Sequence, residues 1–274
     1  MDGRKPMTSA PPRPLATLSE KTRRGIIGVL TDIDDTLTTQ GQLTAAAYGA
    51  LERLSEAGKI VVPVTGRPAG WCDHIARMWP VDAVVGENGA FYMRYDTARG
   101  KLMRRFVTSD ASRREQRARI AALGEAIVAA VPGCALASDQ HYRESDLAID
   151  YCEDVTALPR VAVDRIVALM EAAGMTAKVS SIHVNGWFGD YDKLTTTKLL
   201  LREVHGVDLD ARRRSFVFVG DSPNDAPMFG YFPHAVGVAN LAQFLDRVPT
   251  PPAYVTVGEA GAGFVEVVNT LLGP

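Results

Sequence analysis

A short apolar run, Gly25 to Leu30, leads directly into an acidic turn that carries Asp32, Asp34 and Asp35. The run predicts a buried strand, and ligands of open α/β sheets bind at the carboxyl ends of such strands. Three carboxylates at one place repel one another unless a cation lies among them. Because no His or Cys accompanies them, ligation of Mg²⁺ by oxygen atoms fits best. A polar turn with an Asp as helix cap is the alternative, and three acids in four positions argue against it.

The chain on both sides of this turn alternates between short apolar runs and amphipathic stretches. In the first part, the pattern predicts strands at 25–30, 60–64 and 83–85 and helices at 43–57 and 69–78. In the last part, it predicts helices at 194–205, 241–247 and 263–272 and strands at 215–219, 235–238 and 254–257. This rhythm is typical of an α/β fold, here a Rossmann-like core with a parallel sheet and helices on both faces.

The middle of the chain has a different pattern. It predicts a hairpin at 90–107, helices at 111–131 and 159–173, a strand at 147–151 and a strand-like stretch at 177–188. Hairpins mixed with helices indicate a separate α+β module. We therefore expect a core made of residues 25–91 and 186–274, an inserted α+β cap at 92–185, and a disordered tail at 1–24, which is rich in Pro, Arg, Lys and Thr.

The bulk composition excludes several classes of protein. The 274 residues carry a formal net charge of −2, which gives no reason to expect a nucleic-acid partner. The three cysteines are odd in number and lack CxxC spacing, so a disulfide framework and a zinc site are both disfavoured. No apolar run approaches the roughly 20 residues that span a bilayer, and the first residues lack the apolar stretch of a signal peptide. We expect a cytoplasmic protein without a membrane partner.

Three further motifs follow or precede predicted strands. The second strand ends in Thr65-Gly66-Arg67, where a hydroxyl and backbone N–H groups could hold a phosphate oxygen, although Thr-Gly is also an ordinary turn. A late strand ends in the acidic stretch Gly220 to Asp225, which could also be a helix-capping turn. Lys193 could offset the charge of the acids or cap a solvated helix, and Lys198 competes with it for this role.

Taken in order, these motifs resemble those of the haloacid dehalogenase superfamily. The first motif, Asp-x-Asp-x-Thr, is matched by Asp32, Asp34 and Thr36. The second, third and fourth motifs are matched by Thr65, by Lys193, and by Gly220, Asp221, Asn224 and Asp225. Glu87-Asn88-Gly89 resembles an element of the subgroup with a large α/β cap, which includes Cof-type sugar phosphatases, sucrose-phosphate phosphatase and phosphomannomutase. The resemblance covers about residues 25–274 and departs at Asp35, where the family commonly has Gly.

The resemblance implies a mechanism as well as a fold. Asp32 would attack phosphorus, and Asp34 would protonate the leaving oxygen and later activate water. Mg²⁺ would be held by Asp32, the backbone carbonyl of Asp34, and Asp221, while Thr65 and Lys193 would bind the phosphoryl group. Residues expected to orient these groups or to contact phosphate are Gly66, Arg67, Asn88, Asn224 and Asp225. The added charge of Asp35 would leave the acting residues intact.

The expected cap contains two polar stretches, Gln140 to Asp146 and Ser181 to Trp187. Hydrogen-bonding groups of this kind suit a hydroxylated leaving group, so a sugar phosphate is the favoured substrate, with Arg143, His183 and Asn185 as candidate contacts. A polar sheet edge would look the same. A phosphohexose mutase of the same fold and a non-enzymatic binding protein on this scaffold remain alternatives to a phosphatase that acts on a small phosphorylated metabolite.

Overall fold

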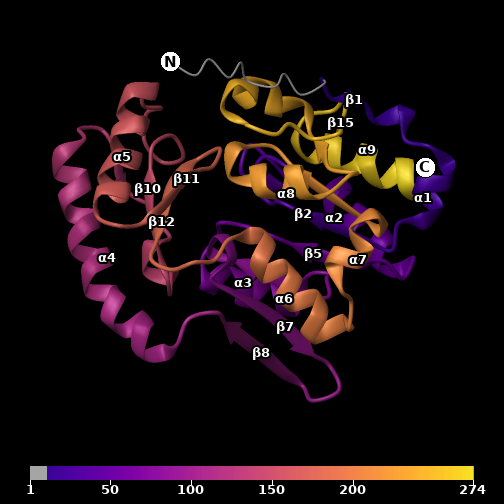
Figure 1. Cartoon of the computed structure of the whole chain (residues 1–274), viewed down its shortest axis with the longest axis horizontal. Coiled ribbons are helices and arrows are strands. Elements are labelled where there is room, and N and C mark those ends of the chain that lie inside the picture. The colour runs from indigo at the N-terminus through magenta and orange to yellow at the C-terminus, as the bar shows by residue number, and fades with distance from the viewer. Residues whose placement is uncertain (1–10, 274) are drawn as a thin grey trace, which may run out of the picture.

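The computed structural model describes residues 11–273, and its centre is a six-stranded parallel sheet (Figure 1). The strand order is β1-β15-β14-β13-β2-β5. The strands are β1 (Arg13–Pro14), β2 (Gly28–Thr31), β5 (Ile60–Pro63), β13 (Phe216–Gly220), β14 (Val236–Gly237) and β15 (Tyr254–Val255). Because β2 and β13 are neighbours in register, with Thr31 opposite Val219, the residues that follow them emerge at one edge of the sheet. The predicted α/β core is confirmed.

Helices cover both faces of this sheet. One face packs against α2 (Ala45–Glu56), α3 (Ala69–Met78) and α9 (Ala260–Leu272), and the other against α6 (Lys193–His205), α7 (Leu209–Arg212) and α8 (Ala226–Tyr231). Successive strand residues such as Val29 and Leu30 belong to opposite hydrophobic clusters, because side chains alternate across a strand. Two-sided burial explains why these strands are apolar without interruption.

The predicted hairpin lies with the core. Strands β7 (Phe91–Asp96) and β8 (Lys101–Phe106) pair in an antiparallel sheet with β6 (Val84–Gly86), which is bridged to the main sheet through Val64 and Val85. Met93 is fully buried in the core cluster, so the core continues beyond residue 91, where the sequence predicted its boundary with the cap. The inserted unit instead starts at the helix cap Ser109.

Residues 109–188 form a second lobe, which we call the cap lobe (Figure 1). Its sheet has the order β11-β12-β10-β9, from β9 (Ala135–Leu136), β10 (Asp146–Asp150), β11 (Thr176–Val179) and β12 (His183–Trp187). Helices α4 (Asp110–Ala130) and α5 (Arg160–Ala172) bury Leu147, Ile149 and Val184 of this sheet in a separate hydrophobic cluster. The alternate residues Asp146, Asp150, His183 and Asn185 therefore share the opposite face, and all four are buried.

The described part of the expected tail is ordered. Beyond β1, it contains a 3₁₀ turn (Leu15–Thr17) and α1 (Glu20–Gly25). Leu15 and Leu18 are buried in the core cluster, and β1 extends the parallel sheet next to β15, which accounts for the order. The expectation of disorder is wrong for residues 13–24, and its first part, 1–10, lies outside the described residues.

Smaller differences concern local geometry. The strand-like stretch at 177–188 is two antiparallel strands, β11 and β12. The segment at 241–247 is part of a 3₁₀ helix (Ala239–Arg247). A small hairpin of β3 (Thr38–Thr39) and β4 (Gln42–Leu43) follows the acidic turn. Other 3₁₀ turns cover Glu87–Gly89, Gln140–Tyr142, Arg213–Ser215 and Pro223–Asp225.

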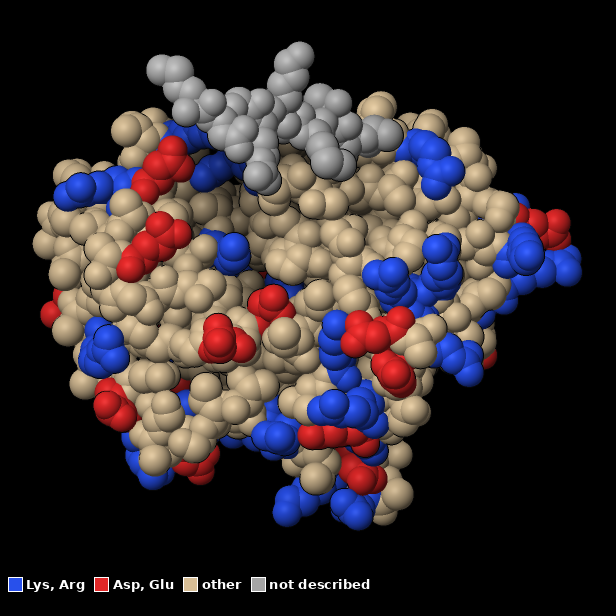
Figure 2. Space-filling view, viewed as in Figure 1, with Lys and Arg blue, Asp and Glu red and all other residues tan. Residues whose placement is uncertain are grey.

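Within residues 11–273, no helix has the length and apolarity to cross a membrane. Basic and acidic side chains are interspersed on the face in Figure 2.

Candidate active site

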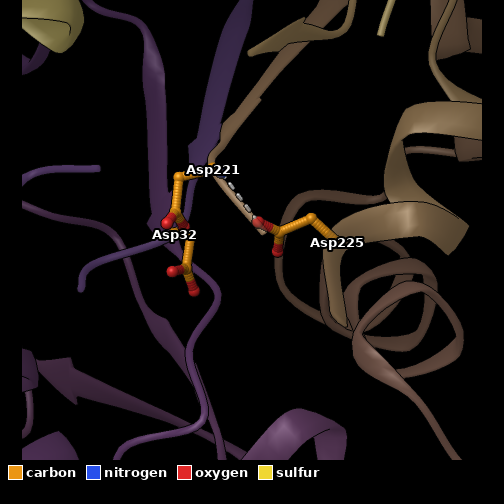
Figure 3. A group of neighbouring side chains, drawn as sticks. All are labelled: Asp32, Asp221 and Asp225. Carbon is orange, nitrogen blue, oxygen red and sulfur yellow. Dashed lines mark hydrogen bonds between the residues drawn. The ribbon is translucent and has the colours of Figure 1, made fainter. Parts of the chain in front are cut away.

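The acidic residues that follow β2 and β13 converge at the carboxyl edge of the parallel sheet. The backbone N–H of Asp32 donates to the carbonyl of Val219 at 2.9 Å, which fixes the two strand ends side by side. Carboxylate oxygens of Asp32, Asp221 and Asp225 lie within 4.8 Å of one another, and all three residues are buried. Figure 3 shows Asp32 and Asp221 with neighbouring carboxylates, while Asp225 approaches from the segment that leads into α8.

Lys193 joins this cluster from the first turn of α6. Its Nζ lies 2.7 Å from Asp32 Oδ1 and 2.7 Å from Asp225 Oδ1. Burial alone would lower the pKa of Lys193, but Asp225 and Asp32 raise it, so the ammonium group stays charged. The competing candidate, Lys198, lies elsewhere and pairs with Asp210 at 2.7 Å. The structure therefore brings Lys193, and not Lys198, to the acidic cluster.

The cluster has the properties of a cation site. Asp221 is fully buried, its Oδ1 accepts a hydrogen bond from Thr36 at 3.3 Å, and its Oδ2 has no partner among the described residues. Burial and the charge of Asp32 raise the pKa of Asp221 well above its usual value. Burial also raises the pKa of Asp32 to about 8, against the lowering effect of Lys193. A divalent cation would satisfy the orphaned oxygen and favour both ionised carboxylates, so these residues fit Mg²⁺.

Asp225 is less free to act as a ligand than its place in the cluster suggests. Its Oδ1 accepts from Lys193, and its Oδ2 accepts from the backbone N–H of Asp221 at 3.1 Å and of Ser222 at 3.4 Å. These bonds hold the turn after β13 and place Lys193. Asn224 has a similar local role, because its side-chain oxygen accepts a hydrogen bond from the Ser222 hydroxyl at 2.8 Å.

Asp34 does not belong to this group of three carboxylates and is bound by Arg67. The Nε of Arg67 donates to both carboxylate oxygens of Asp34, at 3.0 and 3.1 Å. The other side of the guanidinium contacts two acids of the cap lobe, Glu153 at 2.6 Å and Asp139 at 3.3 Å. Arg67 is buried and stacks on the ring of Trp71 at 4.3 Å. One side chain of the core thus connects Asp34 to the cap lobe.

Asp35 occupies the position where the family commonly has Gly, and the backbone explains that preference. Its φ is 53°, in the left-handed region that glycine adopts readily and that Asp tolerates better than most residues. Its carbonyl accepts from the side chain of Asn240 at 3.0 Å, which holds the turn. Burial raises the pKa of the Asp35 carboxyl.

The Thr65-Gly66 turn faces the acidic residues across the sheet edge. Thr65 is fully buried, and its hydroxyl accepts from the backbone N–H of Arg67 at 3.0 Å. A Cβ atom at Gly66 would lie 3.1 Å from the Asn88 amide nitrogen, which is tight enough that the amide would have to shift. Asn88 is 2% exposed, and neither its amide nitrogen nor its amide oxygen has a hydrogen-bond partner among the described residues. The Asn88 amide is therefore free to bind a ligand.

The candidate substrate contacts of the cap lobe lie on the face that meets the core, but two of them are engaged. Arg143 pairs with Asp139 at 2.9 Å and Asp146 at 3.0 Å, and donates to the Gly66 carbonyl at 2.8 Å. Its side chain is fully buried, so the expectation that Arg143 contacts substrate is not supported, and it instead holds the cap lobe against the Thr65-Gly66 turn. Asn185 donates to Asp146 at 3.0 Å.

His183, the third candidate, lies beside Glu153. Its Nε2 is 2.8 Å from Glu153 Oε2, close enough for an ion pair when the ring is protonated, although the two atoms are not aligned as a hydrogen bond. Burial alone would raise the pKa of Glu153, but His183 and Arg67 lower it to about 2. Glu153 is therefore the carboxylate that links His183 to Arg67.

Sequence reasoning assigned no role to the four acids that connect the two lobes, Glu87, Asp139, Asp146 and Glu153. Glu87 is fully buried and accepts from the backbone N–H groups of Ala69, Glu144 and Ser145. Burial raises the pKa of Glu87 to about 8. The one available signal was the alternation of Asp146 and Asp150 with Leu147 and Ile149, which indicates a strand with a polar face.

A cavity of about 410 Å³ opens beside Asp34, between the core and the cap lobe. Core residues on its wall include Asp34, Asp35 and Arg67, and cap-lobe residues include Glu153 and Ser181. Asp34 is therefore accessible from the space between the two lobes.

One family of known proteins matches the part of this chain that contains the first half of the core. Residues 29–113 match the family model described as haloacid dehalogenase-like hydrolase. The fold is of the α/β class, and a buried carboxylate cluster lies at the edge of its parallel sheet. The matched segment contains the acidic turn after β2, the Thr65-Gly66 turn and Asn88, so this part of the chain is similar to haloacid dehalogenase-like hydrolases.

Solved structures share this fold at low sequence identity. A Thermoplasma acidophilum protein matches 90% of this chain and 98% of its own, with a TM-score of 0.66 and 18% identity. The C-terminal domain of C. albicans trehalose-6-phosphate phosphatase matches 96% of this chain and 99% of its own, with a TM-score of 0.71 and 14% identity. Sucrose-phosphatase from Synechocystis matches 90% of this chain and 98% of its own, with a TM-score of 0.59 and 15% identity. A comparison with curated proteins finds no match.

Proposed function

We propose that this protein is a Mg²⁺-dependent phosphatase that hydrolyses a small phosphate monoester through an aspartyl-phosphate on Asp32. One observation carries the proposal: Asp32 is buried at the carboxyl end of β2 with Lys193 at 2.7 Å and Asp221 in the same cluster. A nucleophile, a fixed positive charge and an unsatisfied carboxylate oxygen meet there, as transfer of a phosphoryl group requires.

In the first step, an oxygen of Asp32 attacks phosphorus, and the bond from phosphorus to the leaving oxygen breaks. Lys193 lies within contact of Asp32 and offsets negative charge on the phosphoryl group, while the Thr65 hydroxyl and the unpartnered Asn88 amide bind its oxygens. Asp225 keeps Lys193 in place through the second 2.7 Å contact. In the second step, water attacks the aspartyl-phosphate and restores the Asp32 carboxylate.

Asp34 moves the proton in both steps. It would give a proton to the leaving oxygen and take one from the attacking water. Arg67 fixes the orientation of the Asp34 carboxylate, because its Nε contacts both carboxylate oxygens.

Asp32, Asp221 and the backbone carbonyl of Asp34 would hold Mg²⁺. When bound, this ion supplies positive charge against the phosphoryl oxygens and makes ionisation of the buried carboxylates favourable. The unpartnered Oδ2 of Asp221 and the raised pKa of Asp32 support this assignment.

A phosphorylated sugar is the substrate class that we favour. Two of the structurally similar proteins are named as phosphatases of sugar phosphates, and the cavity beside Asp34 is lined largely by hydrogen-bonding side chains. The cap lobe, residues 109–188, would select the leaving group. The three cysteines are free, which fits action in the reducing cytoplasm.

Phosphate release tests the proposal. Purified protein with Mg²⁺ should release phosphate from p-nitrophenyl phosphate and from a subset of a panel of sugar phosphates, compared by kcat/KM. Release no faster than that of the Asp32→Asn variant would favour a binding protein on this scaffold. Transfer of phosphate within a sugar without release would favour a mutase, which Arg143 does not support because its guanidinium is engaged by Asp139 and Asp146.

A further inference from the structure

The charge of the cavity beside Asp34 is informative about the substrate. Three carboxylates line it, those of Asp34, Asp35 and Glu153, and Arg67 is the one cation among the described lining residues. Negative side chains thus outnumber positive ones where the leaving group would lie. A second anionic group on the substrate would face like charges at close range in a partly enclosed space.

Arg67 has no donor to spare for such a group. Its Nε donates to Asp34, one terminal nitrogen contacts Asp34 at 2.8 Å and Glu153 at 2.6 Å, and the other contacts Asp139 at 3.3 Å and Glu153 at 3.5 Å. A guanidinium has five N–H donors, and these contacts account for them. An anion could bind Arg67 only by displacing a carboxylate.

The nearby Arg143 is equally engaged, by Asp139, Asp146 and the Gly66 carbonyl. The remaining polar side chains on the cavity wall are uncharged: the amides of Gln40 and Gln243, the hydroxyls of Thr38 and Ser181, and the thiol of Cys152. The Ser181 hydroxyl is buried and lies near the Asp35 carboxyl, whose pKa it lowers against the effect of burial. These groups are suited to hydroxyl or amine groups of a ligand.

We propose that the site accepts phosphate monoesters whose leaving group is uncharged or cationic, and rejects those that carry a second anionic group. Glu153 is the specificity-determining residue, because it adds a negative charge to the cavity and occupies the Arg67 donors that would otherwise bind an anion. This inference rests on the proposed phosphatase function and narrows its substrate class.

Three small substrates of similar size test it: glycerol phosphate, phosphoethanolamine and phosphoglycerate, whose leaving groups are neutral, cationic and anionic. We expect kcat/KM for phosphoglycerate to be at least about tenfold below that for glycerol phosphate. Repulsion between two like charges a few ångströms apart lowers kcat/KM by about this factor even in a well-screened site. Phosphoethanolamine should equal or exceed glycerol phosphate.

Variants assign the effect to the cavity. Glu153→Gln should reduce the preference for glycerol phosphate over phosphoglycerate, because it removes a charge and frees donors of Arg67. Asp35→Asn provides an independent second variant, since Asn also tolerates the positive φ at this position. The matched control is Glu171→Gln on the exposed side of α5, outside the cavity, which should leave the preference unchanged.

The outcomes separate this inference from the function on which it rests. Phosphate release from p-nitrophenyl phosphate together with equal or faster release from phosphoglycerate than from glycerol phosphate would overturn the inference alone. Discrimination that persists unchanged in both Glu153→Gln and Asp35→Asn would also overturn it. Release from none of the substrates would overturn the proposed function and the inference together.

Discussion

The guanidinium of Arg67 lies 2.6 Å from Glu153, across the boundary between the core and the cap lobe. The same guanidinium holds both oxygens of Asp34, so the position of a cap-lobe carboxylate influences the orientation of the proposed acid and base. The sequence suggested a cap that only selects the substrate. The structure shows that the cap lobe also supplies Glu153 and Asp139, which place Arg67.

The first prediction concerns the nucleophile. Asp32→Asn should lower kcat by at least about a thousandfold, because an amide cannot form the aspartyl-phosphate. The fold should survive, since burial already favours a neutral side chain at this position. Phosphate release and circular dichroism measure the two effects, with Asp73→Asn on the exposed face of α3 as the control. A variant that kept a tenth of the wild-type kcat would contradict the covalent mechanism.

The second prediction concerns the metal. Removal of divalent ions with EDTA should abolish activity, and Mg²⁺ should restore it. In Asp221→Asn, the Mg²⁺ concentration for half-maximal activity should rise by at least about tenfold, the loss seen even for outer partners of metal ligands. Binding to the folded state should also raise the melting temperature of the wild type and not that of the variant. Full turnover in metal-free buffer would show that the activity does not need a metal ion at the carboxylate cluster.

The strands of the core were predictable because they are buried on both faces. An uninterrupted apolar run such as Phe216 to Val219 has few alternatives, and the acids directly after it must emerge at the sheet edge. The meeting of Asp32 with Asp221 follows from the pairing of β2 with β13. Local sequence therefore contains most of the information about this part of the site.

The contacts of the cap lobe were not predictable in this way. Arg67 and Glu153 are 86 positions apart and meet only because the polar face of the cap-lobe sheet packs against the core. No local pattern distinguishes Glu153 from a solvated acid. Arg143 was expected to bind substrate because a lone Arg in a polar stretch has that appearance, but Asp139 and Asp146, each within four positions of it, bind it instead.

The third prediction follows from that pairing. Arg143→Met should lower the free energy of unfolding by about 3–5 kcal/mol, because it leaves Asp139 and Asp146 buried without a cation. Activity on every substrate should fall together, since Arg143 also holds the Gly66 carbonyl. Urea unfolding measures the effect, and Arg160→Met, in an exposed ion pair, should cost less than about 1 kcal/mol. Equal costs for the two variants would show that the Arg143 pairs are not structural.

The last prediction concerns acid stability. Glu153 has a pKa of about 2 in the folded protein, against an ordinary value of 4.5, because its contacts with His183 and Arg67 outweigh burial. Between these values the unfolded chain binds more protons than the folded one, so the contribution of Glu153 is fully present above about pH 4.5 and is lost as the pH falls towards about 2.

Glu153→Gln removes this contribution, so wild type and variant should differ in unfolding free energy near neutral pH and converge as the pH falls through that window. Urea unfolding at a series of pH values measures the difference, and Glu171→Gln, on the exposed side of α5, should show no such convergence. A difference between wild type and Glu153→Gln that stayed constant down to about pH 2 would mean that the carboxylate charge does not hold Arg67. As the pH falls, the difference in unfolding free energy should begin to shrink at the upper end of this pH range, because the unfolded state takes up protons before the folded state does.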